Sequence, residues 1–209
     1  MNPRVWYFPA GHVGRHEAPD DESYHYDLFM GPADVVVYKG DCVYWLDLPH
    51  TARLDVGPTV VKSDAFAVVI RGFKPEPATA RFGCKLPVLP YVNGCSTSEL
   101  FRPPRLGDPT LQRLLIPGGS SEQAHHIHST SRIVYVLRGR GVSVVGMDSP
   151  TRTDLLPGMV CVLQPMVPHH FETPGGEPLE VLPLHVWSST SGESNHPMFR
   201  GTHLTNQGE

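Results

Sequence analysis

Proline and glycine interrupt this chain every few residues, and this feature limits its fold more than any other. The 209 residues include 22 prolines and 20 glycines. A proline inside a helix removes a backbone hydrogen bond and costs about 3 kcal/mol, so long helices are not expected. The one segment with helical character, around residues 96–101, is expected to form no more than a turn.

Short runs of β-branched and aromatic residues lie between these breakers. Many short strands joined by Gly/Pro turns are typical of an all-β sandwich or barrel. We therefore predict an all-β fold, with strands at residues 34–38, 42–46, 65–70, 111–116, 133–137, 142–145, 160–163 and 179–187.

Charge and hydropathy exclude two classes of partner. The formal net charge is −4 and 18% of the residues are charged, so the chain lacks the basic stripe that nucleic-acid binding requires. No apolar run approaches the ~20 residues that a membrane helix needs. The segment Met1–Tyr7 has no positive region followed by an apolar core, so a secretory signal is not expected. We expect a cytoplasmic protein that binds neither nucleic acid nor membrane.

The four cysteines are scattered and form no C-x-x-C pair, which argues against a zinc ribbon. Free thiols in a reducing compartment are expected. A disulfide between Cys84 and Cys95 stays open as an alternative. The cysteines are Cys42, Cys84, Cys95 and Cys161.

The chain divides into three parts. Residues 1–105 are rich in strands but carry no repeated histidine pattern, residues 106–190 hold the histidine motifs, and residues 191–209 are expected to be a loosely ordered tail. The first part is either a degenerate copy of the second or a set of strands that extends the same barrel. We favour the second arrangement.

His126 and His128 are separated by one residue, so on a strand their side chains share one face. Imidazole is the commonest protein ligand of transition metals. His169, brought in from a distant strand, would complete a three-nitrogen site that leaves positions open for a substrate. The pattern therefore predicts a catalytic metal site.

The second half of the chain resembles the cupin family over residues 111–187. Residues resembling the first cupin motif are Pro117, Gly118, Gly119, His126, His128, Arg132 and Gly139; those resembling the second are Leu156, Pro157, Gly158, Val160, Cys161, Val162, Leu163, Pro165 and His169. The resemblance implies a double-stranded β-helix, or jelly-roll barrel, here with a β-rich N-terminal extension. It also implies a metal bound inside by His126, His128 and His169.

Three positions depart from the cupin pattern. Arg132 stands where the first motif has a glutamate ligand, the stretch between Gly119 and His126 is one residue longer than usual, and Met166 replaces a common glycine. The last two are loop changes. The first concerns the chemistry of the site.

Strand parity places Arg132 inward together with Val134 and Val136. Its guanidinium stays protonated and cannot ligate a metal, and burial without a partner is costly. Three arrangements are open. The side chain clamps the carboxylate of an anionic substrate, pairs with Glu122 or Glu172, or extends into solvent.

The other histidines are weighed in the same way. His125 and His170 fall on the faces opposite to His126 and His169. His185 shares a strand face with Trp187, where it either packs in the core or lines a pocket. Surface positions are expected for His12, His16, His25, His50, His196 and His203.

A three-His site without a carboxylate resembles the cupin dioxygenases that act on thiols, β-diketones or aromatic acids. The resemblance favours Fe(II), while Zn, Mn, Ni or Cu also suit imidazole, and it implies a small anionic substrate held by Arg132. Two alternatives stay open: a metal-dependent isomerase, decarboxylase or lyase, and a cupin that binds a small molecule without turnover. A homodimer is also implied, with Ile133, Tyr135 and Leu137 on the contact face.

Overall fold

The computed structural model describes residues 4–18, 25–49, 51–82, 89–90, 92–103, 105, 107–186 and 202–204. Within these ranges the chain is built from short strands, and its one helical turn is η1 (Val92–Gly94). The described part holds no helix with the length and apolar character that crossing a bilayer requires. The all-β prediction is confirmed, and every predicted strand is present, although Tyr38, Ala65 and Val186 at the predicted ends lie just outside the strands.

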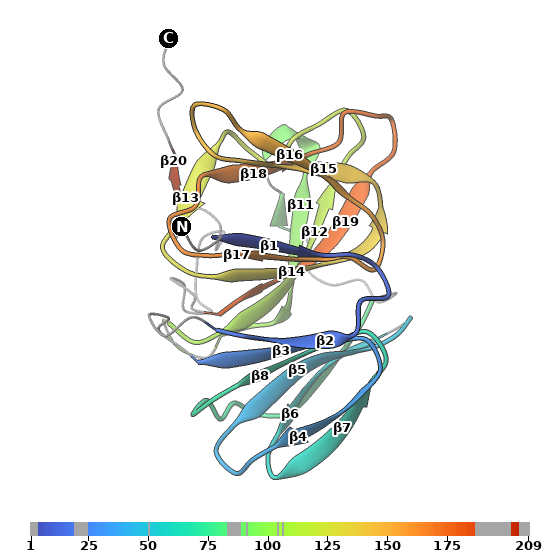
Figure 1. The fold of residues 1–209 in the computed structure, drawn as a ribbon, viewed down its shortest axis with the longest axis vertical. Coiled ribbons are helices and arrows are strands. Elements are labelled where there is room, and N and C mark those ends of the chain that lie inside the picture. The colour runs from blue at the N-terminus through green and yellow to red at the C-terminus, as the bar shows by residue number, and fades with distance from the viewer. Residues whose placement is uncertain are drawn as a thin grey trace.

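Four sheets are stacked along the long axis of the molecule (Figure 1). The two lower sheets come from the first half of the chain. A six-stranded sheet has the order β2 (Gly14–Glu17), β3 (Tyr26–Met30), β8 (Phe66–Ile70), β5 (Cys42–Asp47), β6 (Thr51–Val56) and β9 (Ala78–Arg81), and a two-stranded sheet pairs β4 (Ala33–Val37) with β7 (Thr59–Ser63).

The two upper sheets form the jelly roll. A seven-stranded sheet has the order β1 (Val5–Phe8), β17 (Val160–Leu163), β14 (Arg132–Gly139), β19 (Leu179–His185), β12 (Thr110–Ile116), β11 (Ser96–Phe101) and β10 (Leu89–Pro90). A five-stranded sheet has the order β16 (Thr151–Leu155), β15 (Gly141–Val145), β18 (His169–Glu172), β13 (His126–His128) and β20 (Thr202–Leu204).

The strands of residues 1–105 belong to two different parts of the structure. Strands β1, β10 and β11 extend the seven-stranded sheet of the jelly roll, whereas β2 to β9 build the two lower sheets. The sheets therefore do not follow the predicted division of the chain at residues 105 and 190, and that division stays a proposal.

Three apolar layers hold the four sheets together. The outer core lies between the two lower sheets and includes Val35 and Val61. The middle core joins the six-stranded to the seven-stranded sheet and includes Phe66 and Leu184. The barrel core fills the jelly roll and includes Phe171. Successive residues of a strand point to opposite faces, so the seven-stranded sheet contributes to two cores at once.

Strand β14 shows this division residue by residue. Val134 and Val136 lie in the barrel core, as parity predicts, while Ile133 and Tyr135 lie in the middle core. The Tyr135 ring packs at a tilt against Phe66 of the lower half, with ring centroids 5.6 Å apart. The expected subunit-contact role of this face is therefore wrong, because the chain's own six-stranded sheet covers it. A homodimer stays a prediction without an assigned surface.

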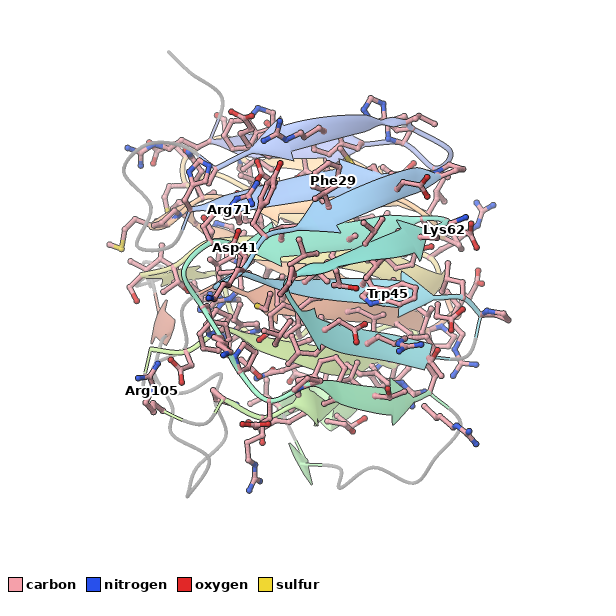
Figure 2. All side chains as sticks on the ribbon, turned by 90° about the horizontal axis from the view of Figure 1, so that it is seen from below. Phe29, Asp41, Trp45, Lys62, Arg71 and Arg105 are labelled. Carbon is pink, nitrogen blue, oxygen red and sulfur yellow. The ribbon has the colours of Figure 1, made fainter. Side chains whose placement is uncertain are left out.

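A cluster of charges stabilises one end of the lower half. The fully buried Asp27 forms ion pairs with Arg15 and Arg71, and Arg71 also donates to Asp41 over 2.8 Å. Arg71 and Asp41 lie side by side in the view from below (Figure 2). Buried carboxylates are tolerated when they are paired in this way.

Two further expectations have clear outcomes. Residues 96–101 form β11 rather than a turn, because pairing with β12 on one side and β10 on the other overrides their weak local preference. No disulfide joins any two of the described cysteines, which are Cys42, Cys95 and Cys161. Cys84 lies outside the described residues, so the Cys84–Cys95 alternative is not decided.

The backbone at Met166 explains why the cupin pattern commonly has a glycine there. Its φ angle of 62° lies in the left-handed region, where glycine is favoured because it has no Cβ. The Met166 backbone N–H donates to the carbonyl of His128 over 2.7 Å, so the turn is held in this conformation. The backbone conformation thus explains why glycine is common at this position. Met166 adopts the same conformation at a cost in conformational free energy.

The buried face of β14 gives the first prediction. Replacing Ile133, which is fully buried, with alanine is expected to lower the free energy of unfolding by about 2–5 kcal/mol. Val60→Thr, at a position 57% exposed, is the matched control, with an effect within about 0.5 kcal/mol. Urea unfolding measures both. A change of oligomeric mass in Ile133→Ala without loss of stability would show that this face contacts another subunit.

The turn at Met166 gives the second prediction. Met166→Gly is expected to raise the free energy of unfolding by about 0.5–1 kcal/mol, because relief of the left-handed strain exceeds the entropy that glycine adds to the unfolded chain. Met166→Ala keeps a Cβ and is expected to gain nothing. Chemical denaturation of the metal-free proteins compares the three, and a glycine variant less stable than wild type would contradict the strain argument.

Candidate metal centre

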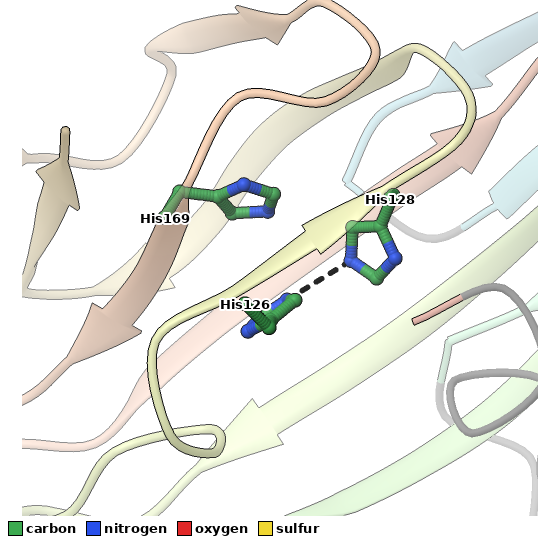
Figure 3. A group of neighbouring side chains, drawn as sticks. All are labelled: His126, His128 and His169. Carbon is green, nitrogen blue, oxygen red and sulfur yellow. Dashed lines mark hydrogen bonds between the residues drawn. The ribbon is translucent and has the colours of Figure 1, made fainter. Parts of the chain in front are cut away.

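Strands β13 and β18 lie side by side and bring three histidines into the jelly roll. His126 is in register with His169, and His128 follows on the same face of β13 (Figure 3). Potential ligand atoms of the three side chains lie within 4.8 Å of one another, and all three residues are buried. The two segments that the sequence nominated are thus brought together by strand pairing.

The three rings face a common point. The Nε2 atoms of His126 and His128 are 3.0 Å apart, and the His169 ring centroid is 4.7 Å from that of His126 and 5.2 Å from that of His128. Two nitrogens at this separation require a proton or a cation between them. A coordinated cation satisfies both at once.

Backbone carbonyls fix the tautomer of two of these rings. His126 Nδ1 donates to the Ala124 carbonyl over 2.9 Å, and His169 Nδ1 donates to the Val167 carbonyl over 2.7 Å. A carbonyl only accepts, so Nδ1 carries the hydrogen of each neutral ring and Nε2 keeps its lone pair. This is the usual arrangement of histidines that bind metal through Nε2.

Burial keeps these imidazoles neutral. Desolvation lowers the pKa of His126 to about 4 and the pKa values of His128 and His169 well below their ordinary range, and the nearby Arg132 charge lowers them further. Metal ligands must be deprotonated, so the neutral form is the competent one. The donor set of three imidazoles fits a first-row divalent transition metal, which His126, His128 and His169 would hold.

Arg132 begins strand β14 and lies in register with His185. It is buried, so the alternative that it extends into solvent is wrong. It donates to the Thr130 hydroxyl and, over 3.3 Å, to the Ser131 carbonyl. Its Nε has no partner among the described residues. The guanidinium therefore places a buried positive charge beside the histidines.

The two acids considered as partners of Arg132 have different roles. Glu172 forms an ion pair with Arg152 and a hydrogen-bond contact with His170, so its proposed pairing with Arg132 is wrong. Glu122 is buried and accepts a hydrogen bond from the Phe171 N–H over 3.0 Å. Among the described ion pairs none joins it to Arg132.

Glu122 and Arg132 nevertheless influence each other. Burial raises the pKa of Glu122 to about 7, and the charge of Arg132 opposes part of this shift. Burial lowers the pKa of Arg132 to about 9, again opposed by the partner charge. The two charges are thus close enough to interact but too far apart to form an ion pair.

His125 and His170, each next to a member of the trio, contact each other instead. Their Nδ1 atoms are 2.8 Å apart, and His125 Nε2 donates to the Gly146 carbonyl over 2.7 Å. His170 also lies 3.3 Å from a Glu172 oxygen. This pair links β18 to the segment leading into β13, so it helps to fix the spacing of the two strands that carry the trio.

Two further side chains belong to the same interior. The His185 ring centroid lies 6.4 Å from that of His128, which supports the pocket-lining interpretation; Trp187 lies outside the described residues. Gln112 on β12 is fully buried, and sequence reasoning missed it because glutamine carries no motif. The sequence feature that could have identified Gln112 is its position on the same strand face as the inward-facing Leu114 and Ile116.

The remaining histidines lie away from this interior. His12 and His16 are partly buried against Phe8, and His16 also contacts Trp6. His25 is exposed. The side chains of His50, His196 and His203 lie outside the described residues.

The pKa of Glu122 gives a pH-dependent prediction. The folded protein binds the Glu122 proton more tightly than the unfolded chain, so this residue favours folding below pH 4.5 and loses that contribution as the pH rises through about 7. A glutamine side chain at this position does not titrate and can still accept the Phe171 N–H. We expect Glu122→Gln to gain stability over wild type by about 2–3 kcal/mol between pH 5 and pH 8. Urea unfolding of the chelator-treated proteins tests this prediction. Parallel curves of unfolding free energy against pH for wild type and Glu122→Gln would contradict it.

Comparison with known proteins agrees with the jelly-roll fold. A family model described as a cupin domain matches residues 112–187. The crystal structure of Lactobacillus farciminis oxalate decarboxylase in a formate complex is 10% identical, with 86% of this chain and 85% of that chain covered and a TM-score of 0.54. A second oxalate decarboxylase structure is also 10% identical and covers 86% of this chain and 76% of that chain, with a TM-score of 0.51.

A cupin 2 conserved barrel domain protein from Rhodopseudomonas palustris is 21% identical over 59% of this chain and 79% of that chain, with a TM-score of 0.45. No curated protein matches the chain. The two oxalate decarboxylase likenesses concern the fold alone, and they extend beyond residues 112–187 into the first half. The jelly-roll strands, the matched motifs and the converging histidines together show that residues 112–187 of this chain match a cupin domain.

Proposed function

We propose that this protein is a metal-dependent enzyme that acts on a small anionic substrate. In this proposal His126, His128 and His169 hold one divalent metal ion, and iron(II) is the favoured metal. The observation that carries the proposal is the convergence of three buried, neutral imidazoles beside a buried guanidinium that has no ion-pair partner among the described residues. We infer a dioxygenase, an enzyme that places both atoms of O₂ in its organic product.

The neutral ligand set supports iron and an anionic substrate together. Three imidazoles leave the full charge of a divalent ion uncompensated, so an anion that binds directly to the metal is favoured. When bound, iron supplies Lewis acidity and redox chemistry toward dioxygen. The protein's part is to hold the metal and to exclude water with the apolar barrel core.

Arg132 orients the substrate in this proposal. Its buried guanidinium can donate to a carboxylate through a fork of N–H groups, and such charge-assisted bonds are strong in a water-excluded site. An incoming carboxylate would also supply the negative charge that no described ion pair gives to Arg132. His185, in register with Arg132, lines the same side of the interior.

A redox-neutral reaction is the second candidate. The same histidines and Arg132 could polarise a bound acid for decarboxylation, isomerisation or elimination, with zinc, manganese, nickel or copper as the metal. The structural likeness to the Lactobacillus farciminis oxalate decarboxylase motivates a test of this class, although it concerns the fold alone. Dependence on dioxygen separates the two candidates.

Anaerobic reconstitution with iron(II) tests the proposal. We expect one equivalent of tightly bound metal, and an affinity at least 100-fold lower in His126→Ala or His169→Ala, because each loses a ligand. Arg132→Met is expected to keep the metal and to weaken binding of small carboxylates about 10- to 100-fold. Calorimetry measures both affinities, and an oxygen electrode records uptake with the same acids.

The exposed His25 supplies the control, since His25→Ala should bind metal like wild type. A filled site that consumes no oxygen with any carboxylate counts against the dioxygenase. Turnover that persists without oxygen favours the second candidate. Wild-type metal affinity in His126→Ala would overturn the ligand assignment altogether.

A further inference from the structure

The large sheet of the jelly roll carries its own polar side chains, facing the three histidines of the small sheet. Thr110, His185 and Arg132 lie in one row across β12, β19 and β14. Gln112 is two residues further along β12, on the same inward face. The next inward residue of β12, Leu114, is already part of the barrel core. Along β12, the barrel interior is therefore polar at one end and apolar at the other.

The inward direction of Gln112 follows from its neighbours on β12. Leu114 and Ile116 share its parity and pack in the barrel core. Leu111, of the opposite parity, packs in the middle core, and Arg113 donates to the Phe82 carbonyl on that outer side. Gln112 consequently points into the interior that also holds the trio and Arg132.

The amide of Gln112 is only half satisfied. The residue is fully buried, its Oε1 lies 3.4 Å from the Thr97 hydroxyl, and its Nε2 has no hydrogen-bond partner among the described residues. Exchanging the two ends of the amide would leave the oxygen without a partner instead. Buried polar atoms in native structures are nearly always bonded, so one end of this amide is available to a ligand.

Neighbouring polar groups differ from Gln112. The Thr110 hydroxyl, in the adjacent inward row, donates to the Phe101 carbonyl over 2.6 Å and is satisfied by the chain itself. Gln112 shares its unsatisfied state with the Nε of Arg132. Within the described part of the chain, the polar end thus holds one cationic and one neutral group that both lack a full set of partners.

Glu99 limits what the Gln112 amide can receive. It lies directly opposite Gln112 in the β11–β12 register, and its carboxylate pairs with Arg102 over 3.0 Å. A ligand carboxylate placed at Gln112 would lie beside this pair, where the Arg102 charge is already taken up by Glu99. A neutral ligand oxygen needs no cation: a carbonyl oxygen can accept from the amide N–H, and a hydroxyl can bond to either end of the amide.

We propose that Gln112 is a specificity-determining residue that binds a neutral oxygen of the substrate while Arg132 holds its carboxylate. The substrate class is then a small hydroxy- or oxo-carboxylic acid, rather than a simple fatty acid or a diacid. This inference rests on the proposed function. A site built to hydrogen-bond an oxygen discriminates strongly against analogues that lack it, because its own polar group is left unpaired.

Acid binding to the Co(II)-loaded protein tests the assignment. The probes are straight-chain alkanoates of three to six carbons, each compared with its hydroxy, oxo and diacid counterparts by calorimetry and by the visible spectrum of the metal. We expect at least one hydroxy or oxo acid to bind at least tenfold more tightly than its matching alkanoate. Gln112→Met, of similar shape without the amide, is expected to abolish that gain and to leave the metal and alkanoate affinities unchanged.

Leu114→Met is the matched control, because it places the same side chain at the next inward position and should preserve the discrimination. Gln112→Asn keeps the amide but withdraws it by one methylene, so a reduced gain is expected there even if the methionine variant is unstable. Equal binding of hydroxy, oxo and plain acids by wild type would overturn the assignment. The assignment would also be overturned if Gln112→Met still bound the hydroxy or oxo acid more tightly than the alkanoate, or if the diacids showed the same increase in affinity.

Failure of the proposed function gives a different result. A protein that takes up no Co(II), or whose acid binding ignores Arg132→Met, contradicts the metal and carboxylate assignments. The same acid series on metal-free protein then still reports on Gln112 alone. Loss of the hydroxy or oxo preference in Gln112→Met under those conditions supports the inference independently, and its persistence overturns it.

Discussion

A seven-stranded sheet that is buried on both faces is the constraint on which the rest of this structure depends. Its residues alternate between two cores: Ile133 and Tyr135 pack on the lower half, and Val134 and Val136 fill the jelly roll. A shift of one residue in any central strand would exchange the two sets. The register that seals the middle core therefore also decides which side chains face the histidines.

Burial has opposite effects on the groups at the polar end of the barrel. It makes the imidazoles of His126, His128 and His169 neutral, which prepares them as ligands. It also disfavours the charged forms of Glu122 and Arg132, which interact without forming an ion pair. An anion bound between metal and Arg132 would relieve part of that cost, so the same low-polarity interior supports both halves of the proposed site.

Much of the fold could be predicted because its signals are local. Proline and glycine spacing excluded long helices, and runs such as 160–163 marked strands that the structure contains. The weak segment 96–101 was misjudged because its strand forms through pairing with β12 and β10, which no local signal predicts. Gln112 was missed for a related reason, since a buried amide with an unsatisfied end is visible only when its neighbours are known.

The sequence by itself determined the alternation of the strands, the nomination of His126, His128 and His169 as a group, and the anomaly of Arg132. These depend on residue type and on a period of two, which are properties of short segments. Tertiary structure decided what covers each face: the middle core hides the expected dimer surface, and Glu172 is paired with Arg152 instead of Arg132. Such outcomes depend on contacts between segments far apart in the chain, and no local pattern encodes them.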